Sequence, residues 1–248
     1  MGIRDLVKHT HRYYGVDTET YNTPSFGLKS IQIASNDRTW YFTVDDWSQS
    51  DMDIRNRISK QFIDWISDLD HNATLGFFNI NYDFSQIAHY VICDSGYKYV
   101  EHHDRLSPGM IRILESDRQL YKVELVNPLG KRVVMIDIAN FLTATNLNKA
   151  CKDWIGKSKI DLPSKDFIKS PATDIEREYA IEDAKLTYEL LVKLYQSSVI
   201  EKGTVTIAGR TLKHYKDYLK ENFGLSFNKW AWGTDDSAFV EYHSYIAE

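Results

Sequence analysis

The feature that most restricts the fold is the run YYGVDTETYN, at positions 13–22. Its first half is typical of a buried strand, yet it leads into two carboxylates, Asp17 and Glu19. Residues two apart in a strand point to the same side, so these side chains converge on one place. Like charges held together repel each other unless a cation lies between them. The fold must therefore bring a compensating partner to this strand.

Alternating and helical patterns around this strand predict an α/β chain. Strands are expected at residues 13–17, 30–35, 39–44 and 74–78, with helices at 54–69, behind Asp53 as N-cap, and at 83–92. Strands that are separated by helices tend to pair in parallel. The first half of the chain therefore predicts a mixed sheet with helices packed on it.

The second half returns to β structure and then continues in helices. Strands are expected at 110–116, 119–126 and 131–137, followed by an irregular, lysine-rich segment at 146–170. Thr173 and Glu176 have the spacing of a capping box, which predicts a helix from there to about residue 195. A last helix is expected within 206–224, and the role of residues 95–136 stays open.

Two further carboxylates occupy positions that a solvated surface does not explain. Asp83 follows the apolar strand at 74–78, and Asp183 lies on the helix that the capping box opens. Helical spacing puts Asp183 on one face with Tyr179 and with three leucines, Leu186, Leu190 and Leu194. An aspartate in line with leucines points toward the protein interior, so this carboxylate is expected to be buried.

Buried carboxylates require a cation or a hydrogen-bond donor. No comparable cluster of arginines lies nearby in the sequence, which favours metal ions. An all-oxygen ligand set suits Mg²⁺ or Mn²⁺ better than zinc, and a pair of such ions is used by enzymes for in-line phosphoryl displacement. A tyrosine hydroxyl beside the metals, that of Tyr179, is suited to orienting the attacking water.

Each of these residues also has a simpler structural interpretation. Asp17 and Glu19 alone are typical of a polar strand end, Asp83 of a helix N-cap, and Tyr179 of packing at a helix end. Asp137 ends a strand and is either a further ligand or, as we favour, a surface or N-cap residue. Taken together and in this order along the chain, the acidic residues favour a metal site over these separate structural interpretations.

Composition narrows the range of partners. The net charge of −5 argues against binding nucleic acid by bulk electrostatics, but it is compatible with acids gathered in a metal site. The lysines between residues 149 and 169 are either a solvated segment or a phosphate-binding rim. No signal peptide and no stretch near the ~18 apolar residues of a membrane span occurs. We therefore expect a cytoplasmic protein without a membrane partner.

Three sequence motifs then resemble those of a known enzyme family. DTE after a strand, NxxYD after a second strand and YxxxD on a helix look like the Exo I, Exo II and Exo III motifs. These motifs mark DEDDy 3′→5′ exonucleases of the DnaQ-like, RNase H-fold group. Within that group, the motifs look most similar to those of the proofreading domain of protein-primed family B DNA polymerases, found in phages and linear plasmids.

The resemblance implies a fold and a domain organisation. We expect an RNase H-like, mixed five-stranded sheet flanked by helices, with an inserted β-hairpin region and a helical C-terminal extension. Residues 1–200 would form the exonuclease domain, and residues 201–248 would resemble the start of the exonuclease–polymerase junction. The family's YxGG linker and polymerase motifs do not occur, so the chain is expected to be either a standalone exonuclease or a polymerase split near that junction.

The resemblance also implies roles for individual residues. Asp17, Glu19, Asp83 and Asp183 would hold two divalent ions, Tyr179 would orient the water, Lys157 would contact the scissile phosphate, and Thr20, Asn79 and Tyr82 would hold the 3′-terminal nucleotides. The family's lysine belongs to a Kxx-hydrophobic motif, which both KSKI at 157–160 and KIDL at 159–162 fit. We prefer Lys157 and keep Lys159 as the alternative.

The function implied is metal-dependent hydrolysis of single-stranded DNA from its 3′ end, releasing nucleoside 5′-monophosphates. One alternative keeps this chemistry on RNA, as in RNA-trimming DEDD exonucleases. Another is a non-catalytic DNA-binding module that docks with a separately encoded polymerase subunit. If the chain is encoded by a virus or plasmid, its location would be the host cytoplasm.

Overall fold

The computed structural model describes residues 11–101, 104–116, 119–143, 146–162, 167–201 and 206–224. The chain divides into two compact units, residues 1–199 and residues 200–248. The first unit contains the sheet and most of the helices. In the second, helix α6 spans Ile207–Phe223, and Glu201 forms ion pairs with Arg210, Lys213 and His214.

The first unit is built on one mixed sheet of eight described strands, in the order β3-β2-β1-β4-β8-β7-β6-β5. The strands are β1 His11–Tyr21, β2 Gly27–Ala34, β3 Thr39–Phe42, β4 Asn72–Phe77, β5 Lys98–Tyr99, β6 Met110–Ser116, β7 Gln119–Val126 and β8 Arg132–Asp137. Parallel pairing joins β1 to β4 and β4 to β8, whereas β2 and β3 form an antiparallel meander on β1. The prediction of a mixed sheet is confirmed.

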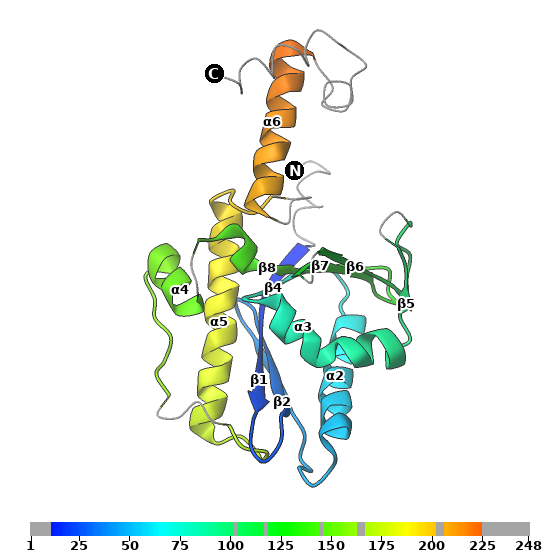
Figure 1. The fold of residues 1–248 in the computed structure, drawn as a ribbon, viewed down its shortest axis with the longest axis vertical. Coiled ribbons are helices and arrows are strands. Elements are labelled where there is room, and N and C mark those ends of the chain that lie inside the picture. The colour runs from blue at the N-terminus through cyan, green and yellow to red at the C-terminus, as the bar shows by residue number, and fades with distance from the viewer. Residues whose placement is uncertain are drawn as a thin grey trace. The chain divides into compact units, whose positions relative to one another are not determined.

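Helices cover the two faces of this sheet. They are α2 Asp51–Ser67, α3 Ile80–His89, the π-helical turn η1 Tyr90–Asp94, the 3₁₀ turn η2 Ile138–Phe141, α4 Leu147–Ile155 and α5 Asp174–Gln196. Helices α2 and α3 lie on one side of the sheet and α5, with α4 beside it, on the other (Figure 1). The main core fills the space between the sheet and α2 and α3.

The alternation of β1 distributes its side chains between these two layers. Tyr14 packs edge-on against Trp65 of α2, and Val16 is fully buried in the same core. Tyr13, one position earlier, instead contacts the ring of Tyr195 on α5, with ring centroids 4.7 Å apart. Odd-numbered positions of β1 therefore face α5, and Asp17 belongs to that set.

A glycine lets α5 come unusually close to β1. A Cβ added to Gly15 would lie 2.2 Å from the Ala184 carbonyl oxygen and 2.2 Å from the Tyr188 amide nitrogen. No side chain fits at that distance, so the helix backbone rests directly on the strand. Since Ala184 follows Asp183, this crossing brings the helix carboxylate to the strand two residues before Asp17.

Several element boundaries differ from those that the sequence predicts. Helix α2 begins earlier than expected, with Ser50 rather than Asp53 as its N-cap. Helix α3 begins at Ile80, not at residue 83, and the segment expected to be irregular contains the whole of α4. The expected hairpin between residues 95 and 136 is present as β6 and β7. It extends the central sheet through β8, so the sheet has eight strands rather than five.

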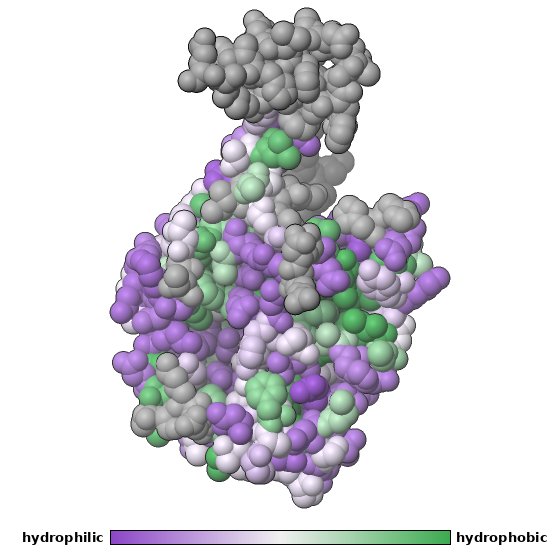
Figure 2. All heavy atoms as spheres, viewed as in Figure 1, coloured by the Kyte–Doolittle hydropathy of each residue, from purple (hydrophilic) through white to green (hydrophobic). Residues whose placement is uncertain are grey.

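One face of the molecule can be described by its hydropathy. On the face shown in Figure 2, hydrophilic residues predominate and apolar residues occur in small separate patches. Among the described helices, none combines the length and the apolar character needed to cross a bilayer.

Candidate metal centre

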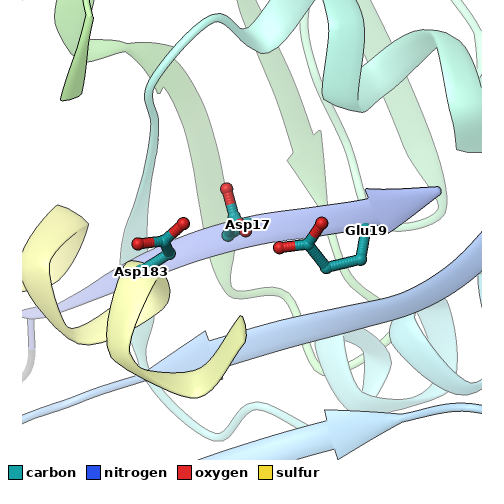
Figure 3. Close-up of side chains that lie close together, drawn as sticks. All are labelled: Asp17, Glu19 and Asp183. Atoms are coloured by element: carbon teal, nitrogen blue, oxygen red, sulfur yellow. The ribbon is translucent and has the colours of Figure 1, made fainter. Parts of the chain in front are cut away.

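Three carboxylates meet between the first strand and the last helix of the larger unit. Asp17 and Glu19 on β1 and Asp183 on α5 each offer an oxygen within 4.8 Å of those of the other two. Figure 3 shows their side chains gathered over the same part of β1. Asp183 is 2% exposed, whereas Asp17 and Glu19 are half-buried. We call these three residues the acidic cluster.

The sheet topology explains where this cluster lies. Parallel pairing of β1 with β4 ends at Gly15, so the strand beyond that point is paired only with β2. The carboxylates thus lie just past the carboxyl end of β4, where α3 begins. Crevices at the carboxyl ends of parallel strands are the usual ligand sites of such sheets.

The acidic cluster is short of positive charge. Burial and the charges of Glu19 and Asp83 raise the pKa of Asp17 well above its usual range. Burial and the charge of Asp183 raise the pKa of Glu19 to about 8, and burial raises the pKa of Asp183 despite a neighbouring lysine. Such upward shifts mean that the ionised cluster is costly without a counter-ion.

The donor set fits a hard divalent cation. The Oδ1 atom of Asp183 is buried and has no hydrogen-bond partner among the described residues. Buried polar atoms are nearly always satisfied, so this oxygen indicates a missing partner. The ligands are all carboxylate oxygens, which suits Mg²⁺ or Mn²⁺.

One lysine does reach the cluster, and it is Lys159. Its Nζ forms an ion pair with Asp183 Oδ2 and lies 5.1 Å from the centre of the Tyr179 ring. Burial opposes its charge, but Asp183 outweighs that effect and raises the pKa of Lys159. Lys157, the residue preferred from sequence, instead pairs with Glu189 at 2.6 Å, half of its side chain being exposed. The structure therefore places Lys159, and not Lys157, beside the acidic cluster.

Asp83 lies near the acidic cluster without joining it. It is 4% exposed, and Oγ1 of Thr18 donates to its Oδ1 at 2.6 Å. Its pKa is raised to about 7 by burial, against the effect of the Thr18 hydrogen bond. The N-cap interpretation of Asp83 is wrong, because α3 begins at Ile80 and Asp83 lies within its first turn. Thr18 points to α3 because it is an even-numbered position of β1.

Asp137 has a structural role at the end of β8. Its side chain caps η2 by accepting from the Ala139 amide at 2.9 Å, and it also accepts from the Asn79 amide at 3.1 Å. The N-cap interpretation is therefore confirmed, although the residue is buried rather than at the surface. Asp137 holds the loop that leads into α3 and thereby helps to fix Asp83.

The residues expected to contact nucleotides lie at an exposed rim beside Asp83. Thr20 Oγ1 and the hydroxyl of Tyr82 are hydrogen-bonded at 2.6 Å, and Tyr82 is 41% exposed. Asn79 is exposed as well and has a left-handed backbone, with φ 83°. An asparagine tolerates this conformation better than most residues. The rim connects the end of β1 with the start of α3.

Tyr179 lies one turn before Asp183 and packs in a small second core. It is 9% exposed and contacts Tyr21 and Phe167, with Trp47 and Leu162 around them. Burial raises the pKa of Tyr179 to about 12, so the hydroxyl remains protonated and able to donate. The packing interpretation holds for the ring, while the nearby Lys159 shows that the residue also borders the acidic cluster.

Two residues that shape the site were missed from sequence. Gly15 sets the distance between β1 and α5, and Thr18 fixes the orientation of Asp83. A lone glycine inside a strand pattern is a signal of close backbone approach and could have indicated Gly15. No comparable signal marks Thr18, since threonine is common in strands.

No protein-family model and no curated protein sequence matches this chain. Solved structures do resemble it. Phi29 DNA polymerase in complex with primer-template DNA and incoming nucleotides aligns with a TM-score of 0.60 and 17% identity over 84% of this chain and 34% of the polymerase. The same polymerase in complex with single-stranded DNA aligns with a TM-score of 0.61 and 17% identity over 84% of this chain and 35% of the polymerase. The likeness is one of fold, and the chain spans about a third of the polymerase's length.

A weaker likeness, too low in TM-score to bear on fold or function, is to the Aedes aegypti Nibbler EXO domain. Its TM-score is 0.44, with 12% identity over 85% of this chain and 89% of that domain.

Proposed function

We propose that this chain is a metal-dependent 3′→5′ exonuclease of the DEDDy type that acts on single-stranded DNA. The observation that carries the proposal is the acidic cluster, in which Asp17, Glu19 and Asp183 approach within 4.8 Å while one buried oxygen of Asp183 has no partner. Asp83 stands behind it, fixed by Thr18. A structural role alone does not explain so many carboxylates with so little compensating charge.

Two divalent ions, Mg²⁺ or Mn²⁺, are the proposed cofactors. Asp17, Glu19 and Asp183 would hold one of them, and Asp17 and Asp83 would hold the second, Asp83 partly through water. When bound, such ions supply Lewis-acid stabilisation of the charge that develops on phosphate oxygens during hydrolysis. Orientation of the attacking water and further stabilisation of negative charge would come from side chains of the protein.

Tyr179 and Lys159 are proposed to act next to the carboxylates. The Tyr179 hydroxyl stays protonated at neutral pH, so it can donate to and orient a water molecule. Lys159 keeps its charge because Asp183 raises its pKa, and its only described ion pair is with Asp183. In the substrate complex we expect its ammonium group to move to the scissile phosphate and stabilise it electrostatically.

The exposed rim is proposed to hold the 3′-terminal nucleotides. Tyr82 presents an aromatic ring suited to stacking on a base, and Thr20 and Asn79 offer polar groups for a sugar or phosphate. A fold shared with a polymerase that was solved with single-stranded DNA supports a DNA substrate. Trimming of RNA keeps the same metal centre and is the second candidate, since only contacts to the 2′ position would separate the two.

We also propose a domain organisation, a partner and a cellular location for this protein. Residues 1–200 would be the exonuclease domain and residues 201–248 an extension that resembles a polymerase junction, so a separately encoded polymerase subunit is a candidate partner. A cytoplasmic location, in the host for a viral or plasmid protein, belongs to the same proposal. The non-catalytic alternative is disfavoured because all four acidic residues are present.

The test is degradation of 5′-labelled DNA and RNA oligonucleotides of matched sequence in Mg²⁺ or Mn²⁺. We expect a ladder that shortens from the 3′ end of DNA, nucleoside 5′-monophosphates as product, and no reaction in chelator. Asp17→Ala should slow the reaction by roughly 10³-fold or more, about 4 kcal/mol of barrier. An inactive wild-type protein, or an Asp17→Ala variant as fast as wild type, would remove the proposal; preference for RNA would select the second candidate.

A further inference from the structure

Lys29 is a fully buried lysine on the α5 side of the sheet. It is 1% exposed, and its Nζ donates to the Ile168 carbonyl oxygen at 3.1 Å and to Glu176 Oε1 at 3.2 Å. The same Nζ lies 5.3 Å from the centre of the Phe167 ring. Lysine is almost never fully buried unless it is paired, so these contacts hold it in one place.

A β-bulge aims Lys29 at these partners. The pairing of β1 with β2 runs Glu19↔Ser30 and then Thr20↔Leu28, which leaves Lys29 as an extra residue in β2. Leu28 and Ile31 both lie in the main core, although regular alternation would not put residues three apart on one face. The bulge thus turns Lys29 away from that core and toward α5.

The partners of Lys29 determine where α5 begins. Glu176 is the last residue of the capping box, and its other oxygen accepts from the Thr173 amide at 2.6 Å. Lys29 therefore ties the first turn of α5 to β2 through one carboxylate. Tyr179 follows three residues after Glu176, so it lies on nearly the same face of the helix, one turn along.

The second partner fixes the other wall around Tyr179. The backbone at Ile168, which Lys29 also binds, adjoins Phe167, and Phe167 packs on Tyr179 in the small second core. The Asn22 amide donates to the Phe167 carbonyl oxygen at 3.1 Å, which joins this segment to the end of β1. Lys29 thus joins the first turn of α5, one turn before Tyr179, to the segment whose Phe167 packs with the Tyr179 ring.

Stability alone gives little reason for a fully buried lysine, paired with a half-buried glutamate, at this position. Removing two charges from water is costly, and well-packed apolar residues often stabilise a protein as much as a buried pair does. A charge pair with two directed contacts does fix orientation, since both partners must lie in line with the ammonium group. Because its partners Glu176 and Phe167 adjoin Tyr179 along the helix and in the second core, we infer that the pair supplies orientation.

We propose that Lys29 is a positioning residue for the hydrolytic reaction, which acts by holding Tyr179 at the acidic cluster. This inference rests on the proposed function, but it concerns a residue that contacts none of the clustered carboxylates within hydrogen-bond distance among the described interactions. It assigns a function to the bulge in β2.

The test is a double-mutant cycle of Lys29→Met and Tyr179→Phe, measured as kcat and KM for oligonucleotide degradation. Methionine keeps the length of the stem and removes the ammonium group. We expect Lys29→Met to lower kcat by roughly tenfold, about 1.4 kcal/mol, with KM within about twofold of wild type. In the Tyr179→Phe background the same change should cost less than about twofold, because residues that act as one unit are not additive.

Lys122→Met is the matched control, since Lys122 also pairs with a glutamate, the buried Glu124 of the sheet, and no described interaction joins it to Tyr179 or Phe167. Its kcat should equal that of wild type. If Lys29→Met loses as much kcat in the Tyr179→Phe background as in wild type, the proposed route through Tyr179 is wrong. Unchanged kcat in Lys29→Met with an active wild type also overturns it.

A structural readout separates this inference from the proposed function. Crystal structures of wild type and Lys29→Met should differ in the position of the Tyr179 hydroxyl relative to Asp183, whether or not the protein degrades DNA. An inactive wild type with a displaced Tyr179 in the variant refutes the function alone. An undisplaced Tyr179 refutes the positioning role. Glu176→Gln, which keeps the helix cap and removes the charge, should displace Tyr179 in the same direction and covers the case in which Lys29→Met does not fold.

Discussion

Two glutamates of the same sheet have opposite electrostatic surroundings. Glu19 on β1 shares the acidic cluster with two aspartates, and burial together with the charge of Asp183 raises its pKa to about 8. Glu124 on β7 is also buried, yet hydrogen bonds from Arg112, Arg132 and Lys122 outweigh that burial and lower its pKa to about 2.

The two sites differ in how far the protein itself neutralises the carboxylate. Around Glu124, Arg112 and Arg132 each come within 2.5 Å of a carboxylate oxygen, so its charge is fully compensated by the protein. Around Glu19, Lys159 and Lys29 offset only part of the effect of burial and of the charges of Asp183 and Asp83, which is why we propose that bound cations complete the compensation. Burial is common to both sites; the sign of the surrounding charge separates them.

The largest expected effect comes from separating the elements of the acidic cluster. Gly15→Ala places a methyl group against the α5 backbone, so the helix must move. We expect a loss of about 2–3 kcal/mol in stability and at least roughly 10²-fold in nuclease activity, because small displacements of catalytic groups are costly. Denaturant unfolding and the oligonucleotide assay measure the two effects.

Gly76→Ala on β4 is the control for that change. Its added Cβ would meet Ile138 Cδ1 at 2.8 Å and Leu191 methyl carbons at 3.1 Å, which are side-chain ends that can shift. Activity should stay within a few-fold of wild type. Equal losses in the two variants would mean that the α5 crossing has no special importance for the cluster.

The next effect compares the two candidate lysines. Lys159→Met should lower activity by roughly ten- to 100-fold, because it removes the positive charge at Asp183, whereas Lys157→Met should change activity by less than about twofold. Steady-state kinetics on one DNA oligonucleotide checks both. The reverse ranking would restore the sequence-based preference for Lys157 and would mean that this segment rearranges when substrate binds.

A smaller effect, on stability and pH, tests the Glu124 side of the comparison. Because its pKa is depressed in the folded state, the stabilisation by Glu124 is complete above the unfolded value of 4.5 and is lost as pH falls toward about 2. Glu124→Gln should therefore lower stability by about 2–3 kcal/mol at pH 7 and flatten the acid branch of the stability curve. Urea unfolding at roughly even pH steps between about pH 2.5 and about pH 7 measures how the stability of each variant depends on pH. The exposed Glu115→Gln on β6 is the matched control and should leave the curve unchanged.

The smallest expected effect has the opposite sign. Asp17→Asn removes one of the repelling charges, so in chelator it should stabilise the protein by about 1 kcal/mol, or roughly 2–4 °C in Tm. Mg²⁺ should raise the Tm of wild type and have much less effect on the variant. If Asp17→Asn destabilises the metal-free protein as Glu124→Gln does, the two sites do not differ in the way described.

Sequence patterns predict most of this fold because they record burial. The alternation in β1 and β7, the capping box of α5 and its leucine face all follow from which side chains avoid water. The same reasoning brings Asp17, Glu19 and Asp183 together, since their spacing ties them to buried faces. Helix α4 was missed because charged and polar residues obscure its short apolar stripe.

The other differences depend on geometry that spacing does not encode. Lys157 and Lys159 are equivalent in sequence, and only the path of the chain after α4 decides which one faces β1. The bulge at Lys29 depends on how two strands are paired, and the left-handed conformation of Asn79 depends on the contact with Asp137. Such features arise from long-range contacts, which a single sequence does not display.

The alternation of β1 has a consequence for how this protein can change through evolution. Deleting the one residue between Gly15 and Asp17 would turn both strand carboxylates toward the hydrophobic core under α2 and α3. The same deletion would turn Thr18 away from Asp83 and toward α5. Substitution at many other positions is compatible with this fold, as the 17% identity to phi29 DNA polymerase illustrates. The number of residues between Gly15 and Asp17 must stay fixed, so we expect insertions and deletions in related proteins only outside this segment.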